Sequence, residues 1–440
     1  MSESVLNDYA QTYVNLILNK TRYDPWDLNW YTEGPFWRRT SMKFSRTYKM
    51  IPDYEIGEGK HGKSLRDICE SAERLEHDLT DYAKTACAEE EKRVTYLREH
   101  AHQLAVRTRL LLGEKMDYDS MTRELYDLTA PACDHSRFDR LLEDARNVLP
   151  GSGDALTRIR DFRRSIRIPR EHLLETVREI GQFFHDASRA HMDIAENNMP
   201  RFRVRELPGS MQFLSVLFGY DYDRIEYERN INLNYPWAVD NLIECIAHEC
   251  EPGHLVYFEK RTKAFIDTGW PEMSVVSQHT SSNAFSEGAA RQAILMCFDD
   301  SLEKMCEYER ETVFDIAGID RGLAAVMPFW YRFCEASGYG KLEATRNIWN
   351  GVWSLDKAGG FLEKYGFNEL GSGVQTLEGM PDDAGHFTAH DYARDVARDF
   401  FRAAAPDVKG QWALYEALCG DDFSMKTILD HSYRLQGPAF

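Results

Sequence analysis

Hydrophobic residues recur at helical spacing through most of the chain. Between residues 64 and 112, Ile68, Ala72, Leu75 and Leu79 stand three or four positions apart, and Glu, Lys and Arg occupy most positions between them. This spacing gives an α-helix one apolar face. Because the stretch is longer than an ordinary globular helix, we predict a helical hairpin or two long helices there.

The same pattern predicts helices elsewhere, and short β-prone runs interrupt it once. Runs at 201–205, 213–217 and 220–227 predict a sheet of two or three strands. The glycines in Ser337-Gly338-Tyr339-Gly340 predict a break between two helices. The expected fold class is therefore mainly α with a small β-sheet, and further helices are expected at residues 2–18, 155–165, 170–197, 255–268, 302–334, 341–365 and 393–405.

One predicted helix ends in an unusual group of polar residues. Apolar residues from Val239 to Ala247 form one helical face, and His248 and Glu249 follow. On an unbroken helix, His254 would lie about 240° around the axis from His248. Pro252 removes a backbone donor and Gly253 permits almost any backbone conformation, so the helix must kink or stop. We expect this break to bring the two imidazoles together.

Two imidazoles with a carboxylate are the ligand set of a catalytic zinc ion that keeps one position open for water. Glu287, in Ser286-Glu287-Gly288, is the expected third ligand, and Glu249 is the expected base that takes a proton from the water. Ser282 or Ser286 is expected to cap the helix that carries Glu287. The alternatives are a core or capping role for the histidines, a Glu287 that merely favours a positive helix end, or other ligands: Glu244, Cys250, Glu251 and Glu272.

The segment HECEPGH at 248–254 resembles the HExxPGH motif of a large bacterial family known as domain of unknown function 885. Members of that family are similar in fold to the thermostable carboxypeptidases of the helical zincin group. The preceding INLNYP and the later Glu287-Gly288 also fit the family pattern, and the resemblance spans roughly residues 201–296. The chain departs from the pattern at Leu255-Val256-Tyr257, where a Gln is usual, and at Ala289, where a Trp is usual.

The resemblance implies a gluzincin-like helical zincin with two helical lobes around a deep cleft. Residues 1–205 would cover the cleft, and residues 206–440 would form the catalytic lobe with the small sheet beside the metal helix. The metal ligands would be His248, His254 and Glu287.

A late segment resembles the His and Tyr that hold the oxyanion in helical zincin oligopeptidases. It contains Gly385-His386 with Tyr392 six residues after the histidine. The resemblance implies that His386 or Tyr392 stabilises the developing alkoxide, which needs a donor besides zinc. A helix-start histidine with a packed tyrosine is the alternative, a second metal site at His386 and His390 is another, and His279 or Tyr339 could take the oxyanion role instead.

Composition limits the classes of partner. The net charge of −19 argues against a nucleic-acid partner. The start of the chain has no signal-peptide pattern and no run of eighteen apolar residues occurs, so we expect no membrane association. Nine scattered cysteines without a CxxC pair indicate reduced thiols in a cytoplasmic protein.

These patterns and the family resemblance predict a zinc-dependent hydrolase, a carboxypeptidase-like metallopeptidase acting on a small peptide or amide. A hydrolase of a small non-peptide amide or ester metabolite is the first alternative, and an inactive binding scaffold is the second. The sequence leaves open exo- or endo-cleavage, Mn²⁺, Fe²⁺ or Co²⁺ in place of one Zn²⁺, and the oligomeric state, with a homodimer as one alternative.

Overall fold

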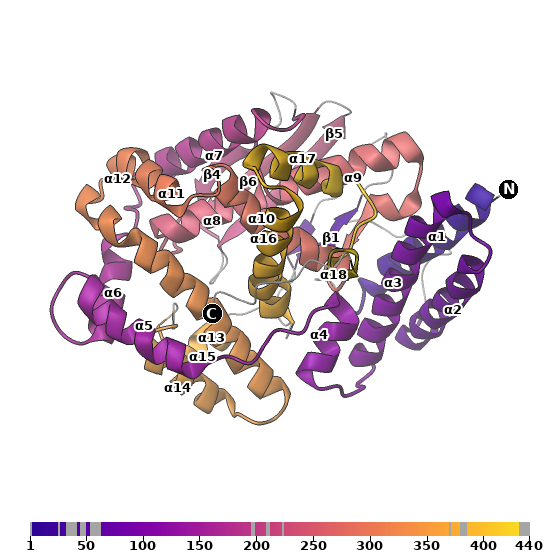
Figure 1. Ribbon diagram of the computed structural model, residues 1–440, viewed down its shortest axis with the longest axis horizontal. Helices are drawn as coiled ribbons and strands as arrows, with labels where there is room; N and C mark the ends of the chain where they lie inside the picture. The colour runs from indigo at the N-terminus through magenta and orange to yellow at the C-terminus, as the bar shows by residue number, and fades with distance from the viewer. Residues whose placement is uncertain are drawn as a thin grey trace.

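The computed structural model describes residues 2–24, 27–31, 42–44, 50–52, 63–194, 199–207, 212–221, 224–368, 371–378 and 385–430. Helices make up most of these ranges, and the strands within them form only small sheets (Figure 1). The prediction of a mainly α fold is therefore confirmed. None of the helices in these ranges has the length and apolar character needed to cross a bilayer.

The first three helices pack together at one end of the molecule (Figure 1). They are α1 (Ser2–Lys20), α2 (Leu65–Ala83) and α3 (Ala88–Leu111). The hydroxyl of Ser64 accepts from the Asp67 backbone N–H, and the Asp67 carboxylate accepts from the Ser64 N–H, so a capping box starts α2. The predicted two long helices are present as a hairpin.

The remaining helices carry most of the hydrophobic core. Those that matter for the site are α8 (Val239–Glu249), α9 (His254–Thr268), α10 (Ser281–Met296), the π-helical turn η4 (Thr388–Tyr392) and α16 (Ala393–Ala404). The others are α4 (Tyr118–Tyr126), α5 (His135–Val148), α6 (Ala155–Ser165), α7 (Leu173–Arg189), η1 (Pro271–Ser274), α11 (Leu302–Tyr308), η2 (Glu309–Val313), α12 (Phe314–Ala317), η3 (Arg321–Val326), α13 (Met327–Trp349), α14 (Leu355–Tyr365), α15 (Gly373–Glu378), α17 (Val408–Cys419) and α18 (Met425–Asp430).

A three-stranded sheet leads into α8. Its strands are β4 (Arg201–Arg205), β5 (Phe213–Asp221) and β6 (Arg224–Asn232), in the order β4-β6-β5. β4 runs parallel to β6 and β5 antiparallel to it, so the predicted small sheet is present. Two smaller antiparallel pairs join β1 (Leu28–Tyr31) to β7 (Val275–Ser277) and β2 (Met42–Phe44) to β3 (Met50–Pro52).

The predicted helix break at 337–340 is wrong, because α13 continues through it. A Cβ on Gly338 would lie 2.3 Å from Oδ1 of Asp391, and a Cβ on Gly340 would lie 2.4 Å from Cδ2 of Phe367. Both glycines therefore serve close packing inside a helix. Each glycine costs about 1 kcal/mol in helix propensity relative to alanine, and each leaves room for a neighbouring side chain that a Cβ would displace.

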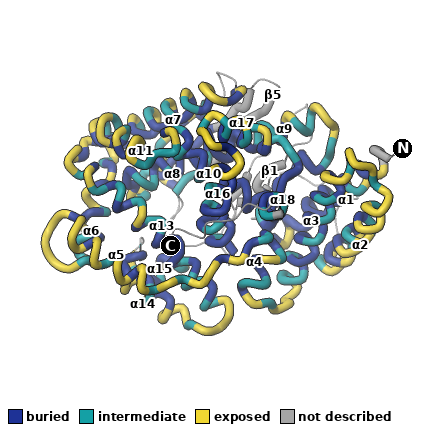
Figure 2. Tube along the Cα trace, in the orientation of Figure 1, coloured by how far each residue is buried: buried dark blue, intermediate teal, exposed yellow. Residues whose placement is uncertain are grey.

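The core is shared between early and late parts of the chain. Ile180 and Phe184 of α7 lie in one hydrophobic cluster with Ile243 and Ile246 of α8 and Trp330 of α13. Residues on both sides of position 205 thus pack together, and the division into lobes 1–205 and 206–440 stays a prediction. Helix α10 is buried along nearly its whole length at the centre of the molecule (Figure 2).

Candidate metal centre

The predicted helix break separates α8 from α9. Helix α8 ends at Glu249, α9 begins at His254, and the peptide bond between Glu251 and Pro252 is cis. The Gly253 N–H donates to the Ala247 carbonyl at 3.0 Å. A Cβ on Gly253 would lie 1.9 Å from the His248 carbonyl oxygen, so only glycine fits this close return of the chain.

The turn brings both imidazoles to one place. The ring centroids of His248 and His254 lie 4.4 Å apart, with the rings at 75°. Nε2 of each ring lies 3.0 Å from the same atom, Oε2 of Glu287. All three residues are buried, with 7%, 7% and 3% of their surface exposed. His248, His254 and Glu287 can therefore present ligand atoms to one ion.

Helix α10 presents Glu287 from its interior. The cap is Thr280, whose hydroxyl accepts from the Asn283 N–H, so the expected Ser282 or Ser286 cap is wrong. Three serines follow Thr280 closely at similar capping propensity, so the sequence alone does not single out Thr280. Glu287 therefore lies beyond the first turn, and attraction to a positive helix end does not account for its position.

The absence of a side chain at Gly288 allows a further histidine to approach the site. A Cβ on Gly288 would lie 2.3 Å from the Ala393 carbonyl oxygen, so α10 and the start of α16 pack backbone to backbone. The turn η4, directly before α16, then places Nε2 of His390 3.1 Å from Oε2 of Glu287. The sequence pattern offered His390 only as a partner of His386, four residues earlier, and did not connect it with Glu287.

The two residues predicted to hold the oxyanion lie close to His390. The His386 ring packs against the His390 ring, with centroids 3.8 Å apart and the ring planes tilted by 34°. Tyr392 packs against the apolar residues Ala130, Leu342 and Phe387. An oxyanion role for His386 or Tyr392 stays a prediction.

The site brings several ionisable side chains together in a buried environment. Burial opposes ionisation of Glu287, but the imidazoles of His254, His390 and His248 hold the pKa of its carboxyl well below the usual range. Burial also opposes the charge on His254 and on His390, yet the Glu287 carboxylate raises the pKa of both. Burial and the His254 ring lower the pKa of His248. A divalent ion binds ionised carboxylates and neutral imidazoles, and these residues can adopt both forms.

Glu249 lies beside this group and keeps access to solvent. Its side chain is 25% exposed, and its Oε2 accepts from the buried Arg229 guanidinium at 3.1 Å. The same Arg229 nitrogen also donates to the Glu249 carbonyl at 3.1 Å. Burial opposes ionisation of Glu249, but Arg229 outweighs it and lowers the pKa of the carboxyl. Arg229 comes from β6, and nothing in the motif pointed to it.

The other carboxylates considered as ligands have different partners. Glu244 pairs with Arg291 at 3.0 Å, Glu251 with His185, and Glu272 with Arg93. Glu287 is thus the carboxylate, among these, that lies between His248 and His254.

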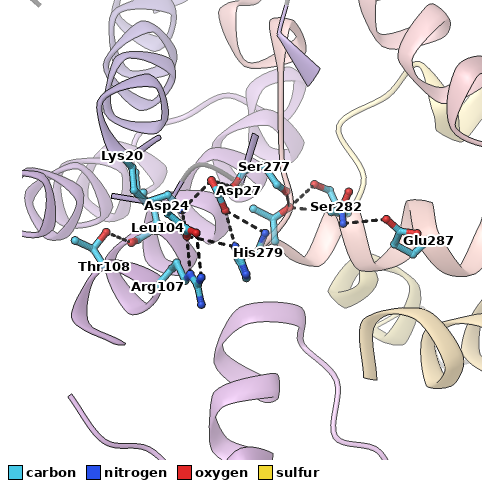
Figure 3. Close-up of polar contacts among 12 residues, drawn as sticks. Lys20, Asp24, Asp27, Leu104, Arg107, Thr108, Ser277, His279, Ser282 and Glu287 are labelled. Carbon is cyan, nitrogen blue, oxygen red and sulfur yellow. Dashed lines mark hydrogen bonds and ion pairs between the residues drawn. The ribbon is translucent and has the colours of Figure 1, made fainter. Parts of the chain in front are cut away.

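A second group of acids and histidine lies near the start of α10. Asp24, Asp27 and His279 also have ligand atoms close together (Figure 3). Lys20 lies 2.8 Å from Asp27, and Arg107 lies 2.7 Å from Asp24, so two cations already balance the two carboxylates. His279 Nδ1 lies 2.7 Å from Asp27. These contacts tie the segment after α1 to β7, and they engage His279, which was one alternative for the oxyanion role.

Comparisons with known proteins add little. No family model matches the chain, and no curated protein matches it. Among solved structures, a chain described as "the putative lipoprotein from Colwellia psychrerythraea" aligns with a TM-score of 0.46 and 10% identity, over 84% of this chain and 70% of that one. A likeness this weak carries no argument, and the family resemblance stays a prediction.

Proposed function

We propose that the protein is a metal-dependent hydrolase whose ion is held by His248, His254 and Glu287. The observation that carries the proposal is the convergence of both imidazole Nε2 atoms on one oxygen of Glu287, each at 3.0 Å. The donor set fits the group, because two imidazoles and one carboxylate are the protein ligands of many hydrolytic zinc sites. A gluzincin-like fold with a deep cleft belongs to the same proposal.

The chain's own residues supply the proton chemistry. An ion bound there would polarise the scissile carbonyl and make a water nucleophilic near neutral pH. Glu249, ionised and partly open to solvent, takes the proton from the water and passes it to the leaving group. Arg229 holds the Glu249 carboxylate in place through its hydrogen bond. The buried ligand residues exclude bulk water and so strengthen electrostatic stabilisation in the site.

A peptide or amide is the substrate class we favour. The departures from the family pattern at 255–257 and Ala289 are the ground for expecting a changed pocket, and with it a non-peptide metabolite. In the structure, however, Leu255, Val256, Tyr257 and Ala289 are all buried in hydrophobic clusters. These four residues therefore belong to the hydrophobic core, and they give no separate support to a non-peptide amide or ester substrate. Exo- or endo-cleavage is decided by comparing peptides with free and amidated C-termini.

The test combines metal analysis with one substitution. Glu249→Gln should keep one ion per chain, because Glu249 is not among the ligands, and should lower kcat by about 10²–10⁴-fold, as expected for loss of a general base. Glu303→Gln, an exposed acid at the start of α11, is the control and should leave kcat unchanged. Full activity in Glu249→Gln would rule out Glu249 as the general base. Wild-type protein that binds no ion would favour the inactive scaffold instead.

A further inference from the structure

We propose that His390 is a fourth protein ligand of the ion, and that the centre is built for an ion accepting five or six ligands. This inference rests on the proposed function. Nε2 of His390 lies 3.1 Å from Oε2 of Glu287, against 3.0 Å for His248 and His254. Three imidazoles thus aim the same ring nitrogen at one buried point.

The second ring nitrogen of His390 makes it suited to binding a metal. Nδ1 lies 2.8 Å from the His386 carbonyl oxygen, and a carbonyl can only accept, so Nδ1 carries the hydrogen. In the neutral ring, Nε2 is then left with its lone pair facing Glu287. Metal-ligating histidines commonly donate their other N–H to a backbone carbonyl in this way. The same tautomer cannot donate from Nε2 to an oxyanion.

The local backbone is shaped to bring this ring inward. His390 lies in the π-helical turn η4, and single π-helical turns occur often at functional sites. Gly288 and Gly338 each leave no room for a side chain, the first against Ala393 and the second against Asp391. Two glycines from two different helices thus flank the segment that carries His390 and allow it to approach Glu287.

Each Nε2–Oε2 distance suits two ligands of one ion, although His390 lies farther from His248 than His254 does. The rings of His390 and His248 are 6.4 Å apart, wider than the 4.4 Å between His248 and His254. Two ligand atoms that each lie about 2.1 Å from one first-row ion are about 3.0 Å apart at a right angle, and the Nε2–Oε2 distances are 3.0 Å for His248 and His254 and 3.1 Å for His390.

A centre with four protein ligands restricts which metal ions could support hydrolysis. Tetrahedral zinc with four protein ligands is a closed, structural site. Hydrolysis at this centre therefore needs an ion with further positions, such as Mn²⁺, Fe²⁺ or Co²⁺. The water and the substrate carbonyl would occupy those positions.

The test counts imidazoles and measures affinity on the full chain. Metal-free protein is loaded with Cu²⁺, and nitrogen couplings are counted by electron paramagnetic resonance after ¹⁵N-histidine labelling. We expect three imidazoles in wild type and two in His390→Ala. Affinity for Mn²⁺ should fall by at least about 100-fold in His390→Ala, because loss of an outer-sphere partner alone costs about 10–100-fold. His191→Ala, which removes an imidazole stacked on Trp412, is the control and should keep wild-type affinity.

The outcomes separate the two proposals. Two imidazoles in wild type, with unchanged Mn²⁺ affinity in His390→Ala, would overturn the role of His390 and leave the three-ligand hydrolase standing. No stoichiometric ion in wild type would overturn both. The count on wild-type protein needs no variant to fold, and His390→Gln repeats the affinity measurement with a side chain of similar size.

Discussion

The turn between α8 and α9 gives the sharpest test of how the backbone builds the centre. The perturbation is Gly253→Ala. The added Cβ would lie 1.9 Å from the His248 carbonyl oxygen and 2.8 Å from the Ala247 carbonyl oxygen. An ordinary carbon–oxygen contact is about 3.3 Å, so the two backbone segments must separate by about 1.4 Å. Both obstacles are backbone atoms that cannot rotate away.

That displacement is large compared with what an ion tolerates. Ligand distances vary by only about 0.2 Å around their usual values, and His254 is the residue directly after the substituted one. We expect the affinity for Mn²⁺ or Zn²⁺ to fall at least 100-fold, equivalent to about 2.8 kcal/mol. The metal-free protein should also lose about 1–3 kcal/mol of unfolding free energy, as for other overpacked sites.

The measurements are competitive metal titration and urea denaturation of metal-free protein. Gly360→Ala is the matched control, because Gly360 lies inside α14 and a Cβ there meets nothing within 4 Å. It should bind metal like wild type and gain about 0.5–1 kcal/mol in stability. Wild-type metal affinity and stability in Gly253→Ala would refute the account of the turn.

Two further predictions concern buried carboxyls outside the centre. Burial raises the pKa of Glu309 to about 8, so between pH 5 and pH 8 the native state keeps a proton that the unfolded state loses. The free energy of unfolding of the wild type should therefore fall with rising pH relative to that of Glu309→Gln, by at most about 1.4 kcal/mol per pH unit. Urea denaturation of both proteins across this range measures the difference, and a difference that does not change with pH would contradict the prediction. Asp27→Asn leaves the buried Lys20 without its close partner and should cost about 3–5 kcal/mol in urea denaturation, whereas Asp267→Asn, in an exposed pair with Lys263, should cost under about 1 kcal/mol. Metal content should stay at the wild-type value in both Asp variants, and loss of an ion from Asp27→Asn would show that Asp24, Asp27 and His279 hold metal.

The sequence was informative where the structure depends on local backbone chemistry. Pro252 and Gly253 predicted the break that brings His254 to His248, because proline and glycine act on the residues next to them. Helical spacing likewise located α2, α3 and α9 within a few residues. The carboxylate of Glu287 could be proposed from the family resemblance, and its distance to both rings came only from the structure.

Sequence patterns failed where packing between distant segments decides the structure. Gly338 and Gly340 look like a loop, and only the approach of Asp391 and Phe367 explains glycines inside α13. Arg229 reaches Glu249 from a strand, and His390 reaches Glu287 from a turn about a hundred residues later in the chain. No local spacing rule encodes such contacts, since each depends on how helices and strands cross.

The turn between α8 and α9 is also supported from near the end of the chain. The hydroxyl of Tyr415, on α17, donates to the Pro252 carbonyl at 2.7 Å. A nascent chain therefore exposes the HExxPGH segment long before the residues that complete and support it have been synthesised. On the proposed function, an ion would be bound only late in the life of the polypeptide, and a fragment ending before residue 385 would carry the full motif yet hold an ion poorly.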